Sequence, residues 1–435
     1  MSSARQRFVA TFGVLGIADV RRLWISQSLS EMGDWAARLA LAVLVYDKSG
    51  SAFWSAATLA VSYLPYLLSP FTTALAQRWS LRHLMIGADL ARLALFAAIA
   101  LPLPTWSLLV MAFLAAVPTP PFEAARVAVT PEAAGEERLG DAIALTNITF
   151  QVAQVVGFGL AGVLLHFVGA EAALLLNAAT FGLSAAVLVR MKAGRHVPEP
   201  EPPLQRTKQA FQQTVSTLLL RRIIVLILLL AFADAAVNAL LPVFVRSNDY
   251  SPLLLTALAA TAPLVGAVSG TVVPRDGANR YLLRTSALLT VVGGGGAAVL
   301  FLLIGSGSTW RGALVAMMAI IAFGVTIAAD IPTMTASMRV VDEDLRASFV
   351  SIVQPALMGT QAIGALVAGV VAVTLSATTT MAISLVIPVL YGCWVLLRLR
   401  ATPDVIDLRE TPGVGQLKVA DPQVRQGESS PNTPA

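Results

Sequence analysis

The chain has 435 residues, of which 56% are hydrophobic and 13% charged, and its mean hydropathy is +0.74. So few polar residues cannot cover a soluble globule of this length, which indicates a membrane protein. The net charge of +5 and the pI near 9.6 do not indicate nucleic-acid binding. The basic residues lie in short loops beside apolar runs, not along one face interleaved with aromatic residues.

The sequence excludes several kinds of chemistry. The single cysteine, Cys393, leaves no intramolecular disulfide and lies in the last apolar run, where packing is its expected role. The three histidines fall in loops or at segment ends without paired metal-ligand spacing, and no lysine follows a glycine as in a phosphate-binding loop. We therefore expect no enzyme, no metal, no cofactor and no use of ATP.

The apolar runs predict an all-α membrane protein with twelve transmembrane helices. Each run is close to the ~20 residues that a ~30 Å hydrocarbon layer requires. Ten-residue segments of alternating hydropathy, which a β-barrel needs, do not occur. The expected spans are 22–46, 52–76, 83–103, 105–125, 142–167, 170–190, 222–246, 251–273, 281–305, 310–337, 348–374 and 378–398.

A proline-rich and basic stretch divides these spans into two pseudo-symmetric six-helix bundles. We expect an N-terminal half at 1–191, a cytoplasmic linker with an interfacial amphipathic helix at 192–221, and a C-terminal half at 222–400. Residues 401–435 are rich in Pro, Gly, Ser and charge without periodicity, which predicts a disordered cytoplasmic tail. At the N-terminal end, the first twenty or so residues show no cleavable signal pattern. The first apolar run is therefore expected to act as an uncleaved insertion signal.

The distribution of basic residues predicts the orientation in the membrane. With a cytoplasmic N-terminus, most of the 30 Lys and Arg residues lie on the inner side. Lys48, Arg246 and Arg311 then face outward, and Arg38 and Arg92 lie within helices. We expect a multi-pass protein of the plasma (inner) membrane with both termini cytoplasmic.

The two halves begin alike. Arg21-Arg22 and Arg221-Arg222 are the only Arg-Arg pairs, and Asp34 and Asp234 follow them at the same distance. Five apolar residues also recur at this offset: Leu29, Ala36, Leu41, Val43 and Val45 match Leu229, Ala236, Leu241, Val243 and Val245. A basic pair followed by a buried acid in register indicates homologous halves, each beginning with a helix that carries a carboxylate deep into the membrane.

The first helix carries Glu31, Asp34 and Arg38 at i, i+3 and i+7, so the three lie on one face. Asp34 and Arg38 have the i,i+4 spacing of an ion pair. Charge at mid-membrane is costly unless it is paired or faces water. Two interpretations stay open. In the first, Arg38 neutralises Asp34 and fixes helix packing. In the second, two acids share one arginine, so one of the carboxylates is left without a cation and is a proton site. In the third helix, Asp89 and Arg92 at i,i+3 are expected to be a packing pair.

Asp234 lies twelve residues beyond Arg222, about 18 Å along a helix at ~1.5 Å per residue and so near the bilayer centre. No basic residue of its own segment is near enough to pair with it, and Asn238 one turn on is its local partner. This favours a protonatable or cation-binding acid over a structural pair. Asp330 in the tenth helix either contacts substrate or caps a helix near Pro332.

Further polar and aromatic residues are candidates for a substrate cavity. Gln151, Gln154, Gln354 and Gln361 either line it or bridge helices. Trp35, Tyr63 and Tyr66 either stack on an aromatic substrate or belong to the core and the aromatic belts.

Four short sequence segments resemble those of a known family. They are Gly33-Asp34-Trp35, residues 45–52 (VYDKSGSA), residues 88–92 (ADLAR) and residues 121–131 (PFEAARVAVTP). The chain resembles the drug-exporter branch of the major facilitator superfamily that includes macrolide-efflux and enterobactin-exporter proteins. The resemblance extends to about residue 400 and implies that the first helix of each half lines a central cavity.

The sequence departs from the family pattern in two places. Thr73 and Gln77 stand where the family's loop between helices two and three has Gly and Asp before Arg78, so the usual charge relay lacks its acid. Gly157-Phe158-Gly159 replaces the Gly-Pro that antiporters favour, although the small-residue helix contact is kept. We expect Arg126 and Arg339, with Arg78, to form the inner gate together with acidic loop residues: Glu132, Glu136, Asp342 and Asp344.

These observations predict an ion-gradient-driven, proton-coupled secondary transporter that exports a small amphipathic molecule such as a drug, antibiotic or siderophore. Asp234, with Asp34 and Glu31, is expected to couple the movement of protons or another cation to that of substrate. The alternatives are a non-transporting membrane sensor and an importer of the same fold. The expected partners are the small molecule, the cation and the lipid bilayer, and the expected state is a monomer.

Overall fold

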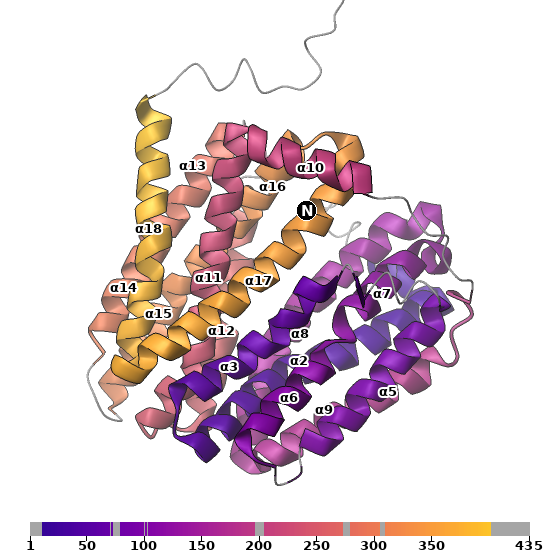
Figure 1. Ribbon diagram of the computed structural model, residues 1–435, viewed down its shortest axis with the longest axis horizontal. Helices are drawn as coiled ribbons and strands as arrows, with labels where there is room; N and C mark the ends of the chain where they lie inside the picture. The colour runs from indigo at the N-terminus through magenta and orange to yellow at the C-terminus, as the bar shows by residue number, and fades with distance from the viewer. Residues whose placement is uncertain are drawn as a thin grey trace, which may run out of the picture.

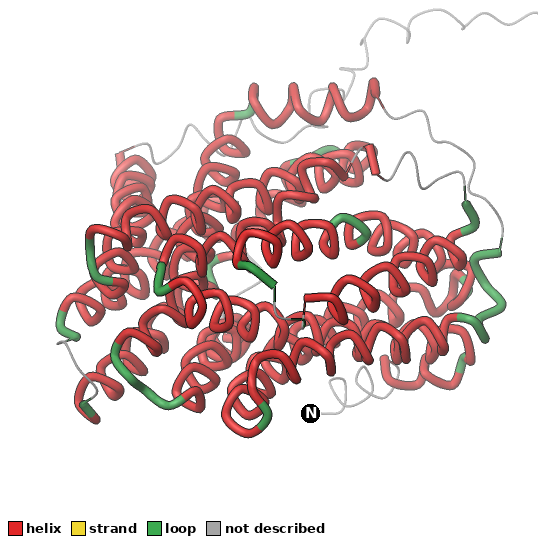
Figure 2. Tube along the Cα trace, turned by 60° about the horizontal axis from the view of Figure 1, so that its bottom comes forward, coloured by secondary structure: helices red, strands yellow, loops and turns green. Residues whose placement is uncertain are grey.

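A computed structural model of the chain describes residues 11–69, 71–72, 79–99, 101, 103–195, 204–272, 279–304 and 309–401. Within these ranges every element of regular structure is a helix (Figure 2). The fold is therefore all-α, as the lengths of the apolar runs predict. The expected tail at 401–435 lies, apart from residue 401, outside the described residues.

The first half of the chain forms α2 (Ala18–Ser49), α3 (Ala52–Tyr63), α5 (Leu81–Ile99), α6 (Thr105–Ala116), α7 (Thr119–Ala134), α8 (Leu139–Phe167) and α9 (Gly169–Leu188). Short 3-10 turns extend them: η1 (Val14–Gly16), η2 (Leu64–Leu68) and η3 (Glu136–Arg138). Gly50 ends α2 with a left-handed φ of 63°, and its N–H donates to Tyr46 O. A residue without Cβ adopts this conformation at little cost. Helix α2 therefore ends here and the chain turns into α3, directly after the last turn of α2, which contains Asp47.

Helix α10 (Leu204–Ser216) leads into the second half. That half contains α11 (Leu218–Ser247), α12 (Pro252–Val272), α13 (Asn279–Leu289), α14 (Gly295–Leu302), α15 (Trp310–Ile327), α16 (Asp330–Val340), α17 (Arg346–Thr374) and α18 (Ala377–Ala401). A π-helical turn, η4 (Thr290–Gly294), joins α13 to α14, and a 3-10 turn, η5 (Glu343–Leu345), precedes α17.

Nine helical stretches among the described residues are long and apolar enough to cross a membrane. They correspond to nine of the twelve expected spans. The other three expected spans fall on helices that are short or charged: α3 with η2 is a shorter apolar helix, α2 carries Glu31, Asp34 and Arg38, and α5 carries Asp89 and Arg92. Charged residues lower the hydropathy of a segment, which explains why α2 and α5 are missed by length and composition alone, whereas α3 with η2 is too short.

The two halves meet along helices that occupy equivalent places. Helix α3 packs on α17, α8 packs on α12, and α2 packs on α11, each pair joining one half to the other. Figure 1 shows the first half in indigo and magenta beside the second half in pink to yellow, with α10 crossing one end. This end is called the α10 end below, and the opposite end, which holds the α2–α3 turn, the Asp47 end.

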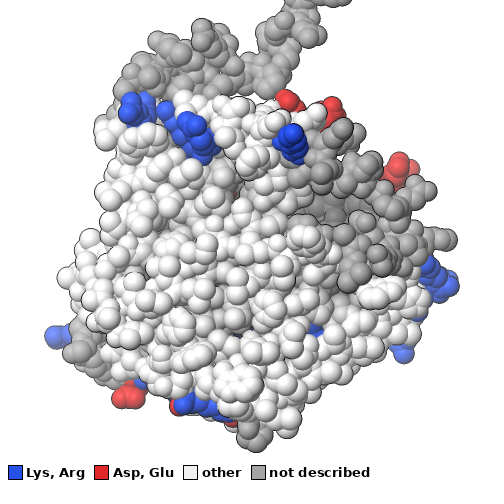
Figure 3. Space-filling view, viewed as in Figure 1, with Lys and Arg blue, Asp and Glu red and all other residues white. Residues whose placement is uncertain are grey.

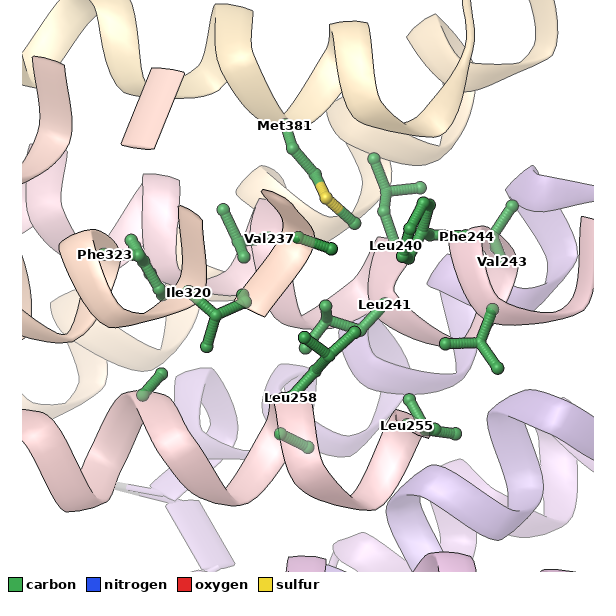
Figure 4. Packing of buried hydrophobic residues seen from close by; sticks show 14 of the residues in the cluster. Val237, Leu240, Leu241, Val243, Phe244, Leu255, Leu258, Ile320, Phe323 and Met381 are labelled. Carbon is green, nitrogen blue, oxygen red and sulfur yellow. The ribbon is translucent and has the colours of Figure 1, made fainter. Parts of the chain in front are cut away.

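The halves approach most closely toward the Asp47 end. A Cβ on Gly162 of α8 would lie 1.5 Å from Thr256 Oγ1 of α12, and one on Gly369 of α17 would lie 2.8 Å from Ala56 Cβ of α3. A side chain at either position would overlap the facing helix, so glycine allows the helices to approach this closely. The largest buried cluster lies nearby, with residues of α11 and α12 interdigitating around Leu240, Leu241 and Leu258 (Figure 4).

The charged side chains are separated by an uncharged band. On the face shown in Figure 3, Lys, Arg, Asp and Glu lie mainly near the two ends, and a wide band of other residues lies between them. Exposed large apolar residues, such as Leu183, Ile363 and Leu390, belong to the long helices. A band of this kind is suited to the hydrocarbon region of a bilayer.

Candidate functional site

A cavity of about 810 Å³ lies between the two halves. Its wall on α2 runs from Gln27 to Ala42, and its wall on α11 runs from Ile227 to Pro242. Thirteen of the residues singled out from the sequence line it: Glu31, Asp34, Trp35, Arg38, Tyr63, Tyr66, Arg92, Arg126, Gln151, Asp234, Asn238, Asp330 and Gln354. Gln154 and Gln361 also line it. The fold thus brings residues from both halves to one site.

Two of the singled-out residues are described but do not line the cavity, and a third is not among the described residues. Asp89 is fully buried behind the wall, and Arg339, at the end of α16, is not part of the lining. Arg78, like Thr73 and Gln77, lies outside the described residues. Arg126 lies in the cavity wall, where its Nη1 is 3.8 Å from Glu31 Oε1. It therefore lies beside an acid of α2 in this structure, and its expected role in the inner gate stays a prediction.

The arginine that comes nearest to Asp34 belongs to another helix. Asp34 Oδ2 lies 4.0 Å from Nη1 of Arg92 on α5, and among the described ion pairs none joins Asp34 to Arg38. Asn177 Nδ2 also donates to Asp34 Oδ1 at 3.5 Å. Arg92 of α5 therefore approaches Asp34 more closely than Arg38 of the same helix does, and both arginines interact with this acid electrostatically.

Arg92 lies between two acids. Its Nη2 is 3.6 Å from Asp89 Oδ1, and Ser184 Oγ donates to Asp89 Oδ2 at 2.5 Å. The guanidinium also packs 4.5 Å from the ring centre of Phe122. Asp89 and Arg92 thus lie together as the i,i+3 spacing predicts, with Asp34 as a third member on the cavity side.

Arg38 contacts aromatic rings. Its Cζ lies 4.4 Å from the ring centre of Trp35 and 5.5 Å from that of Tyr63. Trp35 in turn makes edge-to-face contacts with Phe150 and Phe158 of α8, at 6.0 and 5.0 Å between ring centres. The cation and the rings form one surface, favoured by the attraction between a guanidinium and an aromatic face.

The wall of the second half is acidic. Asp234 accepts from Asn238 Nδ2 at 2.9 Å, and Asp330, the first residue of α16, is exposed to the cavity. Among the described residues, no Lys, Arg or His nitrogen lies within 4.0 Å of either carboxylate, and no basic residue of the second half lines the cavity. The lack of a cation near Asp234 agrees with its sequence environment.

Glu123 of α7 is a cavity residue that the sequence analysis did not select. It accepts a hydrogen bond of 2.8 Å from Tyr66 Oη. Its place as an acid inside the expected span 105–125, three residues before Arg126, was the available signal. No group of three potential metal ligands occurs among the described His, Cys, Asp and Glu residues.

The cavity is closed at the Asp47 end. Arg246 Nη2 of α11 donates to Asp47 Oδ2 of α2 at 2.6 Å, just beyond the last lining residues of both helices. At the other end the lining reaches Gln27 of α2 and Thr335 of α16. The structure is therefore closed by interhelical contacts at one end, while its cavity extends toward the α10 end.

Comparison with known proteins shows the following. A family model described as Major Facilitator Superfamily matches residues 23–360. A bacterial homolog of the human lysosomal transporter Spinster, solved in an inward-facing and occupied conformation, has a TM-score of 0.69 at 14% identity over 88% of this chain and 96% of that one. No curated protein matches the chain.

Other solved structures have the same fold at similarly low sequence identity. A POT family transporter in complex with a thioalcohol-conjugated peptide has a TM-score of 0.68 at 9% identity, over 88% of this chain and 96% of that one. A nucleoside transporter has a TM-score of 0.65 at 13% identity, over 88% and 99%. At these identities the likeness concerns the fold alone.

Proposed function

The chain belongs to the Major Facilitator Superfamily, and we propose that it is a proton-coupled secondary transporter that exports a small amphipathic molecule. Family membership makes it a multi-pass membrane transporter rather than an enzyme. Direction, coupling ion and substrate are the proposed part. The observation that carries the proposal is the cavity between the halves, which combines apolar and aromatic surface with membrane-embedded carboxylates.

Asp234 is the proposed coupling acid. It lies on the first helix of the second half, lines the cavity, and has only Asn238 as a hydrogen-bond partner among the described residues. A carboxylate without a nearby cation in a membrane is costly to keep charged, so binding a proton or a cation there is favourable. Asp34 and Glu31 are the secondary coupling residues, and each is near an arginine.

We further propose twelve spanning helices in two six-helix bundles, with both termini cytoplasmic in the plasma membrane and a monomeric protein. The α10 end is then the cytoplasmic end, and the structure is the inward-open state. Transport requires one half to rock against the other about the site. The proposed inner-gate residues are Arg126, Arg339 and Arg78. They would form the gate when the two halves approach each other at the α10 end.

The experiment is transport by purified protein in proteoliposomes. Accumulation of a panel of amphipathic dyes and antibiotics in cells with and without the protein first selects a substrate. Efflux of that substrate is then driven by an imposed proton gradient. Asp234→Asn should abolish gradient-driven efflux and leave exchange at equal pH largely intact, because neutral Asn keeps the polar contact but carries no proton.

Glu171→Gln, which neutralises an exposed acid at the start of α9, is the matched control and should pump like the parent. If Asp234→Asn pumps as well as the parent, Asp234 is not the coupling residue and Glu31 and Asp330 are the next candidates. If no compound moves under any gradient, the transport proposal itself fails.

A further inference from the structure

The two walls of the cavity differ in their uncompensated charge. The lining of the first half contains three acids and three bases: Glu31, Asp34, Glu123, Arg38, Arg92 and Arg126. The lining of the second half contains two acids, Asp234 and Asp330, and no base among the described residues. The first wall therefore has as many bases as acids, whereas the second has two acids and no base among the described residues.

Within the first wall, Arg38 is the cation that has no described acid within 4.0 Å, and Asp34 and Glu31 interact with it electrostatically from farther away. Arg126 lies 3.8 Å from Glu31 and Arg92 lies 4.0 Å from Asp34. Among the described residues, no carboxylate oxygen lies within 4.0 Å of the Arg38 guanidinium, whose neighbours are the rings of Trp35 and Tyr63. A guanidinium that is planar and stacked on an aromatic ring keeps its edge free to bind a carboxylate or phosphate.

Tyr63 of α3 connects the two unbalanced regions. Its phenol interacts electrostatically with both Arg38 of α2 and Asp234 of α11, and Asp234 interacts in the same way with Asp330. Arg38 and the acids of the second wall therefore line one cavity, and Arg38 and Asp234 both lie near the same aromatic residue. The apolar surface of Trp35, Phe150 and Phe158 adjoins Arg38.

We propose that the cavity binds a zwitterionic amphipath. The anionic group pairs with Arg38, the cationic group lies between Asp234 and Asp330, and the apolar body packs along Trp35 and Phe158. A ligand with both charges pairs with Arg38 and with the acids of the second wall at once, which a purely cationic or purely anionic ligand cannot do. The inference rests on the proposed function in that it takes this cavity as the substrate site.

Two dyes with the same ring system test it. Rhodamine B carries a delocalised cation and a carboxylate, and its ethyl ester lacks only the negative charge. Fluorescence polarisation with the purified full chain in detergent measures the affinity for each dye without any gradient, with empty micelles as the blank. Rhodamine B should bind about tenfold more tightly than the ester, the size expected for one charge-assisted interaction.

Variants assign the two charges. Arg38→Gln should remove the preference for rhodamine B by weakening its binding alone, whereas Arg38→Lys should keep part of it. Asp234→Asn with Asp330→Asn should weaken both dyes, because both share the cation. Arg311→Gln, an exposed arginine beside Trp310 at the start of α15, is the matched control and should change neither affinity.

Equal affinities of the parent for the two dyes, or an equal loss of both in Arg38→Gln, would overturn the assignment of Arg38. Unchanged ester binding in the double aspartate variant would overturn the cationic site. Thermal melting of each variant separates these outcomes from misfolding. Since binding needs no gradient, this pattern can hold in a protein that fails every transport assay, so the two proposals fail separately.

Discussion

Asp47 of α2 and Arg246 of α11 form an ion pair of 2.6 Å that joins the two halves at the end where the cavity is closed. In the repeat, Asp47 corresponds to Ser247 and Arg246 to Tyr46, so the pair lies near the axis that relates the halves. Both side chains are partly exposed, at 43% and 34%, and such pairs contribute about 0.2–1 kcal/mol. The pair therefore biases the equilibrium between the closed and open forms of this end and does not lock it.

Asp47→Arg should open the Asp47 end, because it places two cations at the contact. In a Cys393→Ser background, a cysteine at Ser55, which lines the cavity, should be labelled a few times faster by a membrane-impermeant maleimide added outside. The charge-exchanged double variant, Asp47→Arg with Arg246→Asp, should return labelling toward the parent rate. Equal rates in all three proteins would show that the pair has no role in closure.

Gly162 should be intolerant of a side chain, and Gly159 should not be. A Cβ at Gly162 would lie 1.5 Å from Thr256 Oγ1, whereas a Cβ at Gly159 of the same helix meets no atom within 4 Å. Gly162→Ala should destabilise the protein by about 1–3 kcal/mol through overpacking. Gly159→Ala should be neutral or stabilising by up to about 1 kcal/mol, since alanine favours a helix. Melting temperatures should therefore move in opposite directions, and a fall of the same size in both would contradict the close contact of α8 with α12.

Arg92 should be needed for folding because it lies against two acids. Removing it leaves Asp34 and Asp89 without that cation, and breaking a buried pair costs about 3–5 kcal/mol. Arg92→Gln should melt well below the parent, and adding Asp89→Asn should recover part of the loss. A double-mutant cycle measures this coupling. Strictly additive effects would mean that the guanidinium and the Asp89 carboxylate do not interact.

The orientation can be checked by labelling from outside. Ser49→Cys or Ser376→Cys in the Cys393→Ser background should react with the impermeant maleimide in intact cells, because both positions lie at the end expected to face outward. Glu343→Cys, in the exposed turn before α17, should react only after the membrane is opened. The reverse pattern would invert the proposed topology.

The sequence by itself determined the helices and the candidate residues of the site. Apolar runs of membrane-spanning length predict all-α structure, and the repeat of Asp34 at Asp234 marks two related helices that both line the cavity. These are local properties, since hydropathy and i,i+4 spacing depend only on neighbours along one segment.

Only the tertiary structure decided which charges are partners. Arg92 of α5 lies within 4.0 Å of Asp34, and Arg126 of α7 lies 3.8 Å from Glu31. Each of these pairs joins helices far apart in the chain, so it depends on how the helices pack, and no periodicity within one helix records it. Which arginine and which aspartates are left to face a ligand follows from those pairings, because a charge is available only where packing has brought no opposite charge to it.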